Sequence, residues 1–187
     1  MSRWFVYFLF YSLAGYGLEK LFAWSIHADR QVRKCFLLLP LCPVYGLAMT
    51  ALLALAPEAG NFWVLVVLGG TVCTGVEYLV HLFYDKVFGV WFWDYRQLQG
   101  HLHGRVCPHF AMAWGVLSAL AVRLVQPGVE IFAEWVPRPA VLFLWVLLAA
   151  DCVLSGALLR RYHDTELLTV KAVFAQSRAV SQSSTSL

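Results

Sequence analysis

Three ionisable residues recur at every fourth position of one apolar stretch: Glu77, His81 and Asp85. In an α-helix this spacing turns each residue only about 40° from the previous one, so all three share one face. Ionisable residues inside a membrane helix are costly, face the bundle interior or a water-filled path, and mark candidate functional sites. The stripe therefore predicts a proton or cation relay, a metal site completed by other residues, or a hydrogen-bonded network with a structural role.

Two further acids are expected at the same depth as Glu77. Glu19 lies far along the first apolar stretch, and Asp151 lies beyond the middle of the last one. Counted at about 1.5 Å per residue, all three carboxylates fall in the half of the bilayer that borders the cytoplasm. Ser12 and Gly15 precede Glu19 at helical spacing and predict a small polar groove with Glu19 at its inner end. One function open to these acids is to bind a cation or a proton.

The segment PLCPVYG, from Pro40 to Gly46, interrupts the second apolar stretch. Because proline lacks a backbone N–H and glycine loosens the chain, regular helix is not expected through this segment. Irregular backbone at membrane depth is tolerated where it is buried in protein or lines a cavity. Two interpretations stay open for this segment: its backbone carbonyls face a cavity, or it forms a simple kink. In the third stretch, the small residues of GGTVCTG, from Gly69 to Gly75, predict close helix packing.

A polar and aromatic segment separates the third apolar stretch from the fourth. From Tyr84 to Pro108, charges and aromatic rings occur together, and the segment is too polar to cross a bilayer. Tryptophan and tyrosine favour the headgroup region, so this segment is expected at the membrane interface. Within it, Asp94 and Arg105 are predicted to form an ion pair that folds the segment back across the cytoplasmic mouth of the bundle.

The same segment holds residue types that bind soft metal ions. His101, His103, Cys107 and His109 lie close together in the sequence, but the paired cysteine or histidine spacings of structural zinc sites are absent. We expect no metal and no cofactor. The candidate binding or relay residues are therefore Glu19, Tyr45, Glu77, His81, Asp85, Asp94, His101, Arg105 and Asp151.

The composition belongs to a membrane protein. Of 187 residues, 60% are hydrophobic, 16% aromatic and only 13% charged, with a mean hydropathy of +0.67. Soluble domains are roughly half apolar and a quarter charged, which excludes a water-soluble globular protein. The net charge is only +3 and the basic residues form no dense cluster, so nucleic acid is not an expected partner. The five cysteines show no disulfide framework and are expected to be reduced.

Five apolar stretches are long enough to cross a bilayer, which takes about 20 residues each. The predicted fold is all-α: a membrane bundle of five transmembrane helices that forms a single domain over residues 1–160. Residues 161–187 are hydrophilic, end in SQSSTSL, and are expected to form a partly disordered cytoplasmic tail. The predicted spans are 4–24, 36–56, 62–83, 110–125 and 139–159.

Basic residues are distributed unevenly between the two sides of this topology. With five spans, only Arg3 and Arg138 fall on one side. Short cytoplasmic loops are enriched in lysine and arginine, so the N-terminus is predicted outside and the C-terminus in the cytoplasm. The basic residues of the predicted cytoplasmic side are Arg30, Arg33, Lys34, Lys86, Arg96, Arg105, Arg160, Arg161, Lys171 and Arg178.

At these motifs the chain resembles a known family, the CmpB-like proteins described as putative ABC-transporter type IV permeases. The resemblance runs from the first span to the fourth and implies a small bacterial multispanning protein of the inner membrane. This chain has Leu39 where the family has Gly, Phe92 for Trp, Arg96 for Ser, His101 for Asn and Asp85 for Glu. The matching motifs are Gly15 to Glu19, LPLCPVYG (Leu39 to Gly46), Glu77-Tyr78 with Asp85, FWDYR (Phe92 to Arg96), HLHGRVC (His101 to Cys107) and Trp114-Gly115.

Three functions fit these observations. The first, and the one we favour, is a membrane transport component with a polar site at the cytoplasmic side. The second is a small membrane enzyme that acts on a lipid-like or anionic substrate through Glu77, His81, Asp94 and Arg105. The third is a scaffold or regulatory protein. The sequence has no nucleotide-binding or hydrolase motif and no internal repeat, so transport would require a second copy or a separate ATPase, in addition to the lipid bilayer and an unidentified small molecule.

Overall fold

The fold is built from helices. The computed structural model describes residues 2–25, 35–56, 61–165 and 168, and within them 78% of residues are helical and no strand occurs. The prediction of an all-α fold is confirmed. Most of the predicted tail, the 57–60 turn and the basic residues Arg30, Arg33, Lys34, Lys171 and Arg178 lie outside the described residues. In chain order the helices are α1 (Ser2–Ser25), α2 (Pro43–Leu55), α3 (Phe62–Phe88), α4 (Pro108–Leu120), the π-helical turn η1 (Ala121–Val125), α5 (Gln126–Trp135) and α6 (Arg138–Tyr162).

Prolines set where several helices begin. Pro43 opens α2, Pro108 opens α4, and α6 has a proline at its second position. A proline is tolerated there because the first N–H groups of a helix have no intrahelical partner. Pro127 of α5 is different, because it follows the helical turn η1 directly. By contrast, α3 begins after Asn61, whose side-chain oxygen accepts a hydrogen bond from the backbone N–H of Trp63 at 2.8 Å.

Residues 35–42 are not helical, and helix α2 starts only at Pro43. The backbone N–H of Leu41 donates to the carbonyl of Leu39 at 2.7 Å, and that of Cys42 donates to the carbonyl of Ser12 on α1 at 2.8 Å. The irregular backbone expected from the prolines is therefore present, and one of its N–H groups is satisfied by the neighbouring helix.

Helices α3 and α4 pack closely along small residues. A Cβ atom at Gly70 would lie 3.1 Å from the carbonyl oxygen of Ala111, and one at Gly115 would lie 2.5 Å from that of Val66. Larger side chains at these positions would push the helices apart. Close packing therefore involves the start of the run of small residues, at Gly70. At the end of the run, a Cβ atom at Gly75 would meet nothing within 4 Å.

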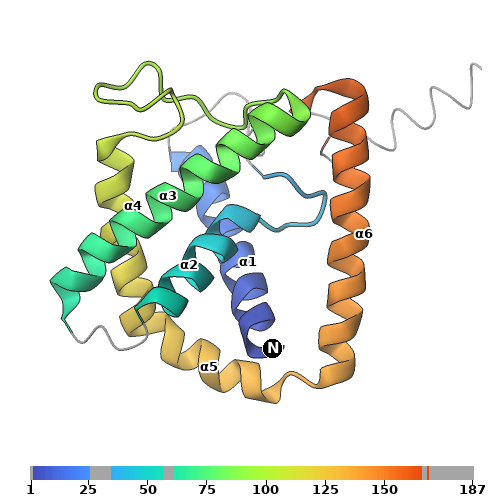
Figure 1. The fold of residues 1–187 in the computed structure, drawn as a ribbon. Helices are drawn as coiled ribbons and strands as arrows, with labels where there is room; N and C mark the ends of the chain where they lie inside the picture. The colour runs from blue at the N-terminus through green and yellow to red at the C-terminus, as the bar shows by residue number, and fades with distance from the viewer. Residues whose placement is uncertain (1, 26–34, 57–60, 166–167, 169–187) are drawn as a thin grey trace, which may run out of the picture.

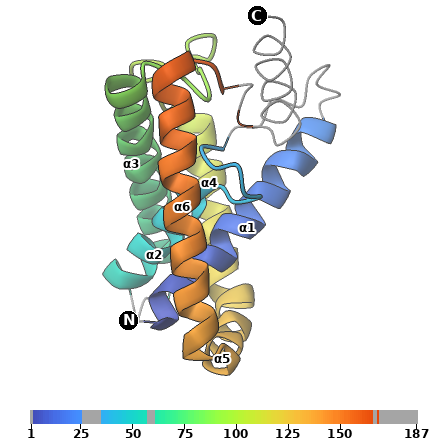
Figure 2. The same ribbon diagram turned by 90° about the vertical axis from the view of Figure 1, so that its right-hand side faces the viewer.

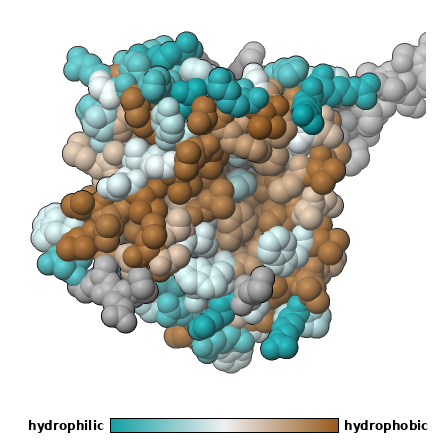
Figure 3. Space-filling view, viewed as in Figure 1, coloured by the Kyte–Doolittle hydropathy of each residue, from teal (hydrophilic) through white to brown (hydrophobic). Residues whose placement is uncertain are grey.

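Three helical stretches are long and apolar enough to cross a membrane: Phe62–Phe88, Pro108–Trp135 and Arg138–Tyr162. Helix α2 is apolar but shorter. Figure 3 shows a hydrophobic band between two hydrophilic ends of the molecule, which is the surface expected of a protein surrounded by lipid. The chain is a membrane protein.

The helices run between two distinct ends of the molecule (Figures 1 and 2). Helices α1, α3 and α6 finish near the end that carries segment 89–107, which we call the loop end. The described N-terminus and α5 lie at the opposite end. Helix α4 runs away from the loop end and bends through η1 into α5, so the helical stretch that starts at Pro108 continues past Val125 to Trp135.

Candidate functional site

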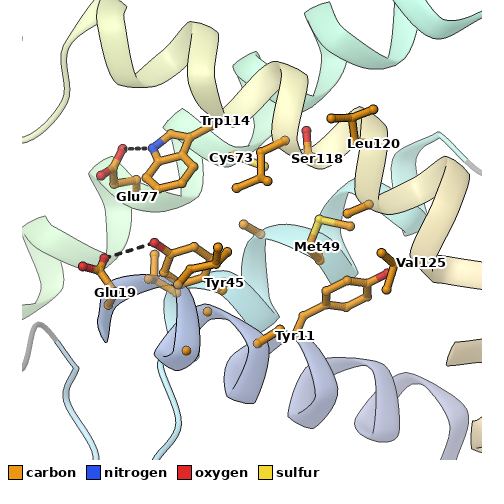
Figure 4. A pocket seen from close by; sticks show the side chains of 18 of the residues that line it. Tyr11, Glu19, Tyr45, Met49, Cys73, Glu77, Trp114, Ser118, Leu120 and Val125 are labelled. Carbon is orange, nitrogen blue, oxygen red and sulfur yellow. Dashed lines mark hydrogen bonds between the residues drawn. The ribbon is translucent and has the colours of Figure 1, made fainter. Parts of the chain in front are cut away.

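A cavity of about 530 Å³ lies between α1, α2, α3 and α4 (Figure 4). This volume is in the range of small-molecule binding sites, which is roughly 300 to 1,000 Å³. Most of its wall is apolar and includes Phe10 of α1 with Ala48 and Met49 of α2. Among the described residues, its charged lining consists of two acids, Glu19 of α1 and Glu77 of α3, which lie at the same end of the cavity.

Among the described residues, two neutral donors from different parts of the chain bind Glu77. The Tyr95 hydroxyl donates to Oε1 at 2.9 Å, and the Trp114 indole N–H donates to Oε2 at 3.0 Å. The Glu77 residue is only 7% exposed. Tyr95 lies outside the membrane-spanning helices, and burial, with the nearby charge of Glu77, raises its phenol pKa far above the usual value. Tyr95 is therefore a permanent hydrogen-bond donor that fixes the direction of the Glu77 carboxylate.

Glu19 is held by Tyr45, whose hydroxyl donates to Oε1 at 3.0 Å. Tyr45 lies against α1 at Gly15, where any Cβ atom would overlap the tyrosine ring. Helices α1 and α2 therefore meet at a glycine, and this close approach lets the tyrosine reach an acid one turn further along α1. Tyr45, Glu19 and Gly15 all line the cavity, whereas the non-helical residues 40–42 before α2 do not.

The three ionisable residues spaced four apart on α3, Glu77, His81 and Asp85, each contact one aromatic residue of segment 89–107. The ring nitrogen Nε2 of His81 lies 3.0 Å from the carbonyl oxygen of Trp93, and the indole N–H of Trp91 donates to Asp85 at 2.7 Å. His81 is buried between these two indoles, and its Nδ1 atom has no hydrogen-bond partner among the described residues. The three pairs are Glu77 with Tyr95, His81 with Trp93 and Asp85 with Trp91.

The spacing of these pairs matches the advance per residue of the two kinds of backbone, α-helix and extended chain. Four residues of α-helix advance about 6 Å, and two residues of extended chain advance about 6.6 Å. A chain that turns back after α3 and runs along it in extended form therefore presents every second residue to every fourth residue of the helix. Because these two advances are nearly equal, one aromatic residue of the segment lies beside each of the three ionisable residues of α3.

The predicted ion pair between Asp94 and Arg105 is wrong. Arg105 instead donates from Nη2 to Asp85 at 2.7 Å, and Asp94 pairs with Arg96 at 2.6 Å. In extended chain, neighbouring side chains point to opposite sides. Tyr95 points toward α3, so Asp94 points to the surface, where its side chain is 38% exposed and Arg96 holds its pKa below the usual value.

Asp151 is separated from the other acids. Its carboxylate accepts hydrogen bonds from the backbone N–H groups of Leu38 at 3.2 Å and Leu39 at 3.0 Å, and from the Ser155 hydroxyl at 3.2 Å. It does not line the cavity. The three acids were predicted at one depth, but Asp151 lies in different surroundings from Glu19 and Glu77. Asp151 instead fixes the irregular backbone between α1 and α2.

The histidines of segment 89–107 take part in loop contacts. His101 Nδ1 accepts from the backbone N–H of Gly104 at 3.1 Å, and His103 lies 3.1 Å from the Tyr78 hydroxyl. Among the described residues, no group of three His, Cys, Asp or Glu side chains is arranged to hold a metal ion. Asp94 and Arg105, two of the four residues of the enzyme hypothesis, form ion pairs with different partners, Arg96 and Asp85.

Two residues beside Glu77 are absent from the predicted site: Tyr95 and Trp114. Trp114 was recognisable only as part of a Trp-Gly motif, and Tyr95 only as part of an interfacial aromatic segment. Their role depends on the return of the chain along α3 and on the close packing of α3 with α4, and neither leaves a periodic signal in the sequence.

The comparison with known families gives one match. The model of the family described as putative ABC-transporter type IV matches residues 6–156. The chain belongs to this family. The match includes most of α1, all of α2 to α5 and most of α6, and it contains every candidate site residue. Neither a curated protein nor a solved structure matches the chain. Membership of the putative ABC-transporter type IV family, together with the apolar helices, supports a role as a membrane transport component.

Proposed function

We propose that the chain is the membrane subunit of a transport system and holds its solute in the cavity between α1 and α4. The observation that carries this proposal is a cavity of small-molecule size with two acids, Glu19 and Glu77, at one end of an otherwise apolar lining. Ionisable side chains at membrane depth are rare and mark candidate solute or proton sites.

The polar end of the cavity is proposed to lie on the cytoplasmic side of the cell membrane. Tyr95, which orients Glu77, belongs to the loop end of the molecule. The described basic residues in or next to the helix ends and the segment at this end are Lys20, Lys86, Arg96, Arg105, Arg160 and Arg161. By the positive-inside rule, this end is proposed to face the cytoplasm, with the N-terminus outside. The proposed topology keeps five crossings, with α1 and the shorter α2 added to the three long apolar stretches.

The energy for transport is proposed to come from a separate ATPase subunit. The sequence has no Walker A motif. One copy of the chain has no internal repeat, so a complete pathway is expected to need a second copy or a membrane partner. Family membership supports the ATPase partner.

Transport can be tested in everted membrane vesicles that contain the full chain and its native partners. The labelled probes are a cation (tetraphenylphosphonium), an anion (taurocholate) and a neutral solute (digoxin). We expect ATP-dependent accumulation of one class, its loss in Glu77→Gln, and its retention in Glu134→Gln, a matched change of an exposed acid on α5. If correctly inserted wild-type protein moves none of the three probes, the transport proposal fails.

A further inference from the structure

The cavity between α1, α2, α3 and α4 is suited to one chemical class of ligand. We propose that it takes up a single aliphatic chain of a lipid-like solute, which enters from the hydrocarbon layer of the membrane. This inference deepens the proposed function and rests on it for the biological role of the bound molecule. Three observations carry it: the hydrogen bonds of the polar lining, the size and apolar character of the wall, and the exposed apolar residues at the border.

The polar groups at the acidic end of the cavity are hydrogen-bonded to each other. The Tyr45 hydroxyl donates to Glu19 at 3.0 Å. The Tyr95 hydroxyl and the Trp114 indole N–H donate to Glu77 at 2.9 and 3.0 Å. The three donors at this end are therefore engaged within the wall, and none of them is left to bind a ligand.

The other polar side chains of the lining are also engaged. Away from the acids, the Tyr11 hydroxyl donates to Gln126 at 2.9 Å (Figure 4). The Trp93 indole N–H and the Ser118 hydroxyl donate to backbone carbonyls at 2.9 and 3.1 Å. A phosphate or carboxylate headgroup would find no unused hydroxyl or N–H donor on these side chains, so its transfer from water would be unfavourable. The lining therefore favours the apolar part of a solute.

The rest of the wall is apolar and bounds a volume of about 530 Å³. Ala48 and Met49 of α2 and Leu117 of α4 belong to it. An engineered apolar protein cavity of roughly 150 Å³ stays free of water and binds benzene. The cavity here is several times larger, so it has room for a long chain rather than for one small molecule. Inside a membrane, hydrocarbon rather than water is the favoured content of such a space.

Exposed apolar residues border the cavity on two helical stretches. Leu18 and Leu21 of α1 line the cavity and are exposed, as are Leu120 of α4 and Leu124 of η1. The second pair belongs to Pro108–Trp135, a stretch long and apolar enough to cross a membrane. Lipid chains are as apolar as leucine and contact such side chains directly. An aliphatic chain therefore reaches the cavity without passing through water, whereas a hydrated solute does not.

Two buried residues of the lining report on a chain inside the cavity. Met49 and Cys73 line it, and they are only 6% and 8% exposed. A chain in the surrounding bilayer does not reach them, whereas a chain in the cavity contacts them. Val146 of α6 is 70% exposed and does not line the cavity, so it reports on the bilayer alone.

Binding is tested on the full chain in phosphatidylcholine nanodiscs. The probe is hexadecanol with a photoactivatable diazirine in its chain, and cross-links are located by tandem mass spectrometry. We expect labelling of Met49 or Cys73 that saturates with the probe and is displaced by unlabelled hexadecanol, while labelling of Val146 does not saturate. Absence of saturable labelling at both buried residues would overturn the proposal.

Two glycines provide a matched pair of variants. Gly17 lines the cavity and Gly75 of α3 does not, and a Cβ atom at either would meet nothing within 4 Å. Gly17→Phe is expected to lower the saturable labelling at least tenfold, and Gly75→Phe to leave it unchanged. Ala14→Phe, at another exposed position of the lining, should act as Gly17→Phe does. Wild-type labelling in both α1 variants, each checked for folding by size-exclusion chromatography, would refute the site.

The labelling and vesicle experiments separate the two proposals. Saturable labelling of Met49 or Cys73 without ATP-dependent movement of any vesicle probe would refute transport and leave the chain site standing. ATP-dependent movement of a vesicle probe, with no saturable labelling of either residue, would refute the chain site and leave transport standing.

Discussion

Each ionisable residue on the inner face of α3 has a different environment, and this difference decides which of them reaches the cavity. Glu77 lines the cavity, whereas His81 and Asp85 are covered by Trp93 and Trp91. The fourfold spacing predicts that the three share a face. It does not predict their partners, because these come from a segment that folds back along the helix and whose register depends on long-range packing.

The true partner of Arg105 gives a prediction at this scale. We expect Asp85→Asn and Arg105→Gln to be non-additive, with a coupling energy of about 0.5–3 kcal/mol, because the two side chains are in contact and only 23% and 12% exposed. The measurement is a double-mutant cycle on thermal unfolding in detergent. The control is the same cycle on Asp94 and Arg96, which should show a smaller coupling because both side chains are in water. Additive losses for Asp85 and Arg105 would contradict the assignment.

Asp151 is predicted to support structure rather than ligand binding. Asp151→Ala removes a carboxylate that accepts from two backbone N–H groups, of which the Leu38 N–H keeps the Ser155 hydroxyl as a second acceptor, and it should lower the free energy of unfolding by about 1–3 kcal/mol. Asp151→Asn retains one acceptor oxygen and should cost less. Once folded, both variants should support the same ATP-dependent probe transport in vesicles as the wild type. Loss of transport at unchanged stability would instead make Asp151 part of the site.

Helix positions follow from local chemistry, but helix contacts do not. The starts of α2 and α4 coincide with Pro43 and Pro108, as the constraint on proline predicts. Small residues predict close packing, but they do not predict which helix packs against them. A Cβ atom at Gly70 would contact α4, whereas one at Gly75 would contact nothing. Which face of a membrane helix contacts protein depends on the whole bundle, since lipid and protein interior are equally apolar.

The contact between α1 and α2 can be tested with two glycines that lie two residues apart. Gly15→Ala places a methyl group into the Tyr45 ring and should lower the stability by about 1–3 kcal/mol, through overpacking. Gly17→Ala has open space and should be neutral, or stabilising by up to about 1 kcal/mol, because alanine favours the helix. Thermal unfolding in detergent compares the two. Equal effects would mean that α1 and α2 do not meet at Gly15.

On the scale of the whole molecule, charge and hydropathy divide the protein into layers. A hydrophobic band separates two hydrophilic ends, and the described basic residues of segment 89–107 lie at one of them. The composition is sufficient to predict this layering. It is not sufficient to predict the cavity, because a cavity depends on where helices fail to pack, and this is decided by the three-dimensional arrangement of α1 to α4.

The orientation in the membrane is predicted from the same charge distribution. A reporter fused after Leu187 should be active in the cytoplasm, and one inserted just before Asn61 should be active outside. Alkaline phosphatase and green fluorescent protein fusions, which are active on opposite sides, provide the measurement and control for each other. The reverse pattern would place the polar end of the cavity on the outer face.

Exposed apolar side chains border the cavity, among them Leu21 of α1, which is 58% exposed, and Leu124 of η1, which is 75% exposed. In a protein surrounded by lipid, such a border has a consequence for how affinity should be expressed. A ligand that arrives through lipid is counted by its mole fraction in the bilayer, not by its concentration in water. Its apparent aqueous dissociation constant then equals the intrinsic constant divided by the partition coefficient. Each methylene group added to the ligand is worth about 0.8 kcal/mol of partitioning, so a homologous series would appear to bind about fourfold more tightly per methylene without one new contact to the protein.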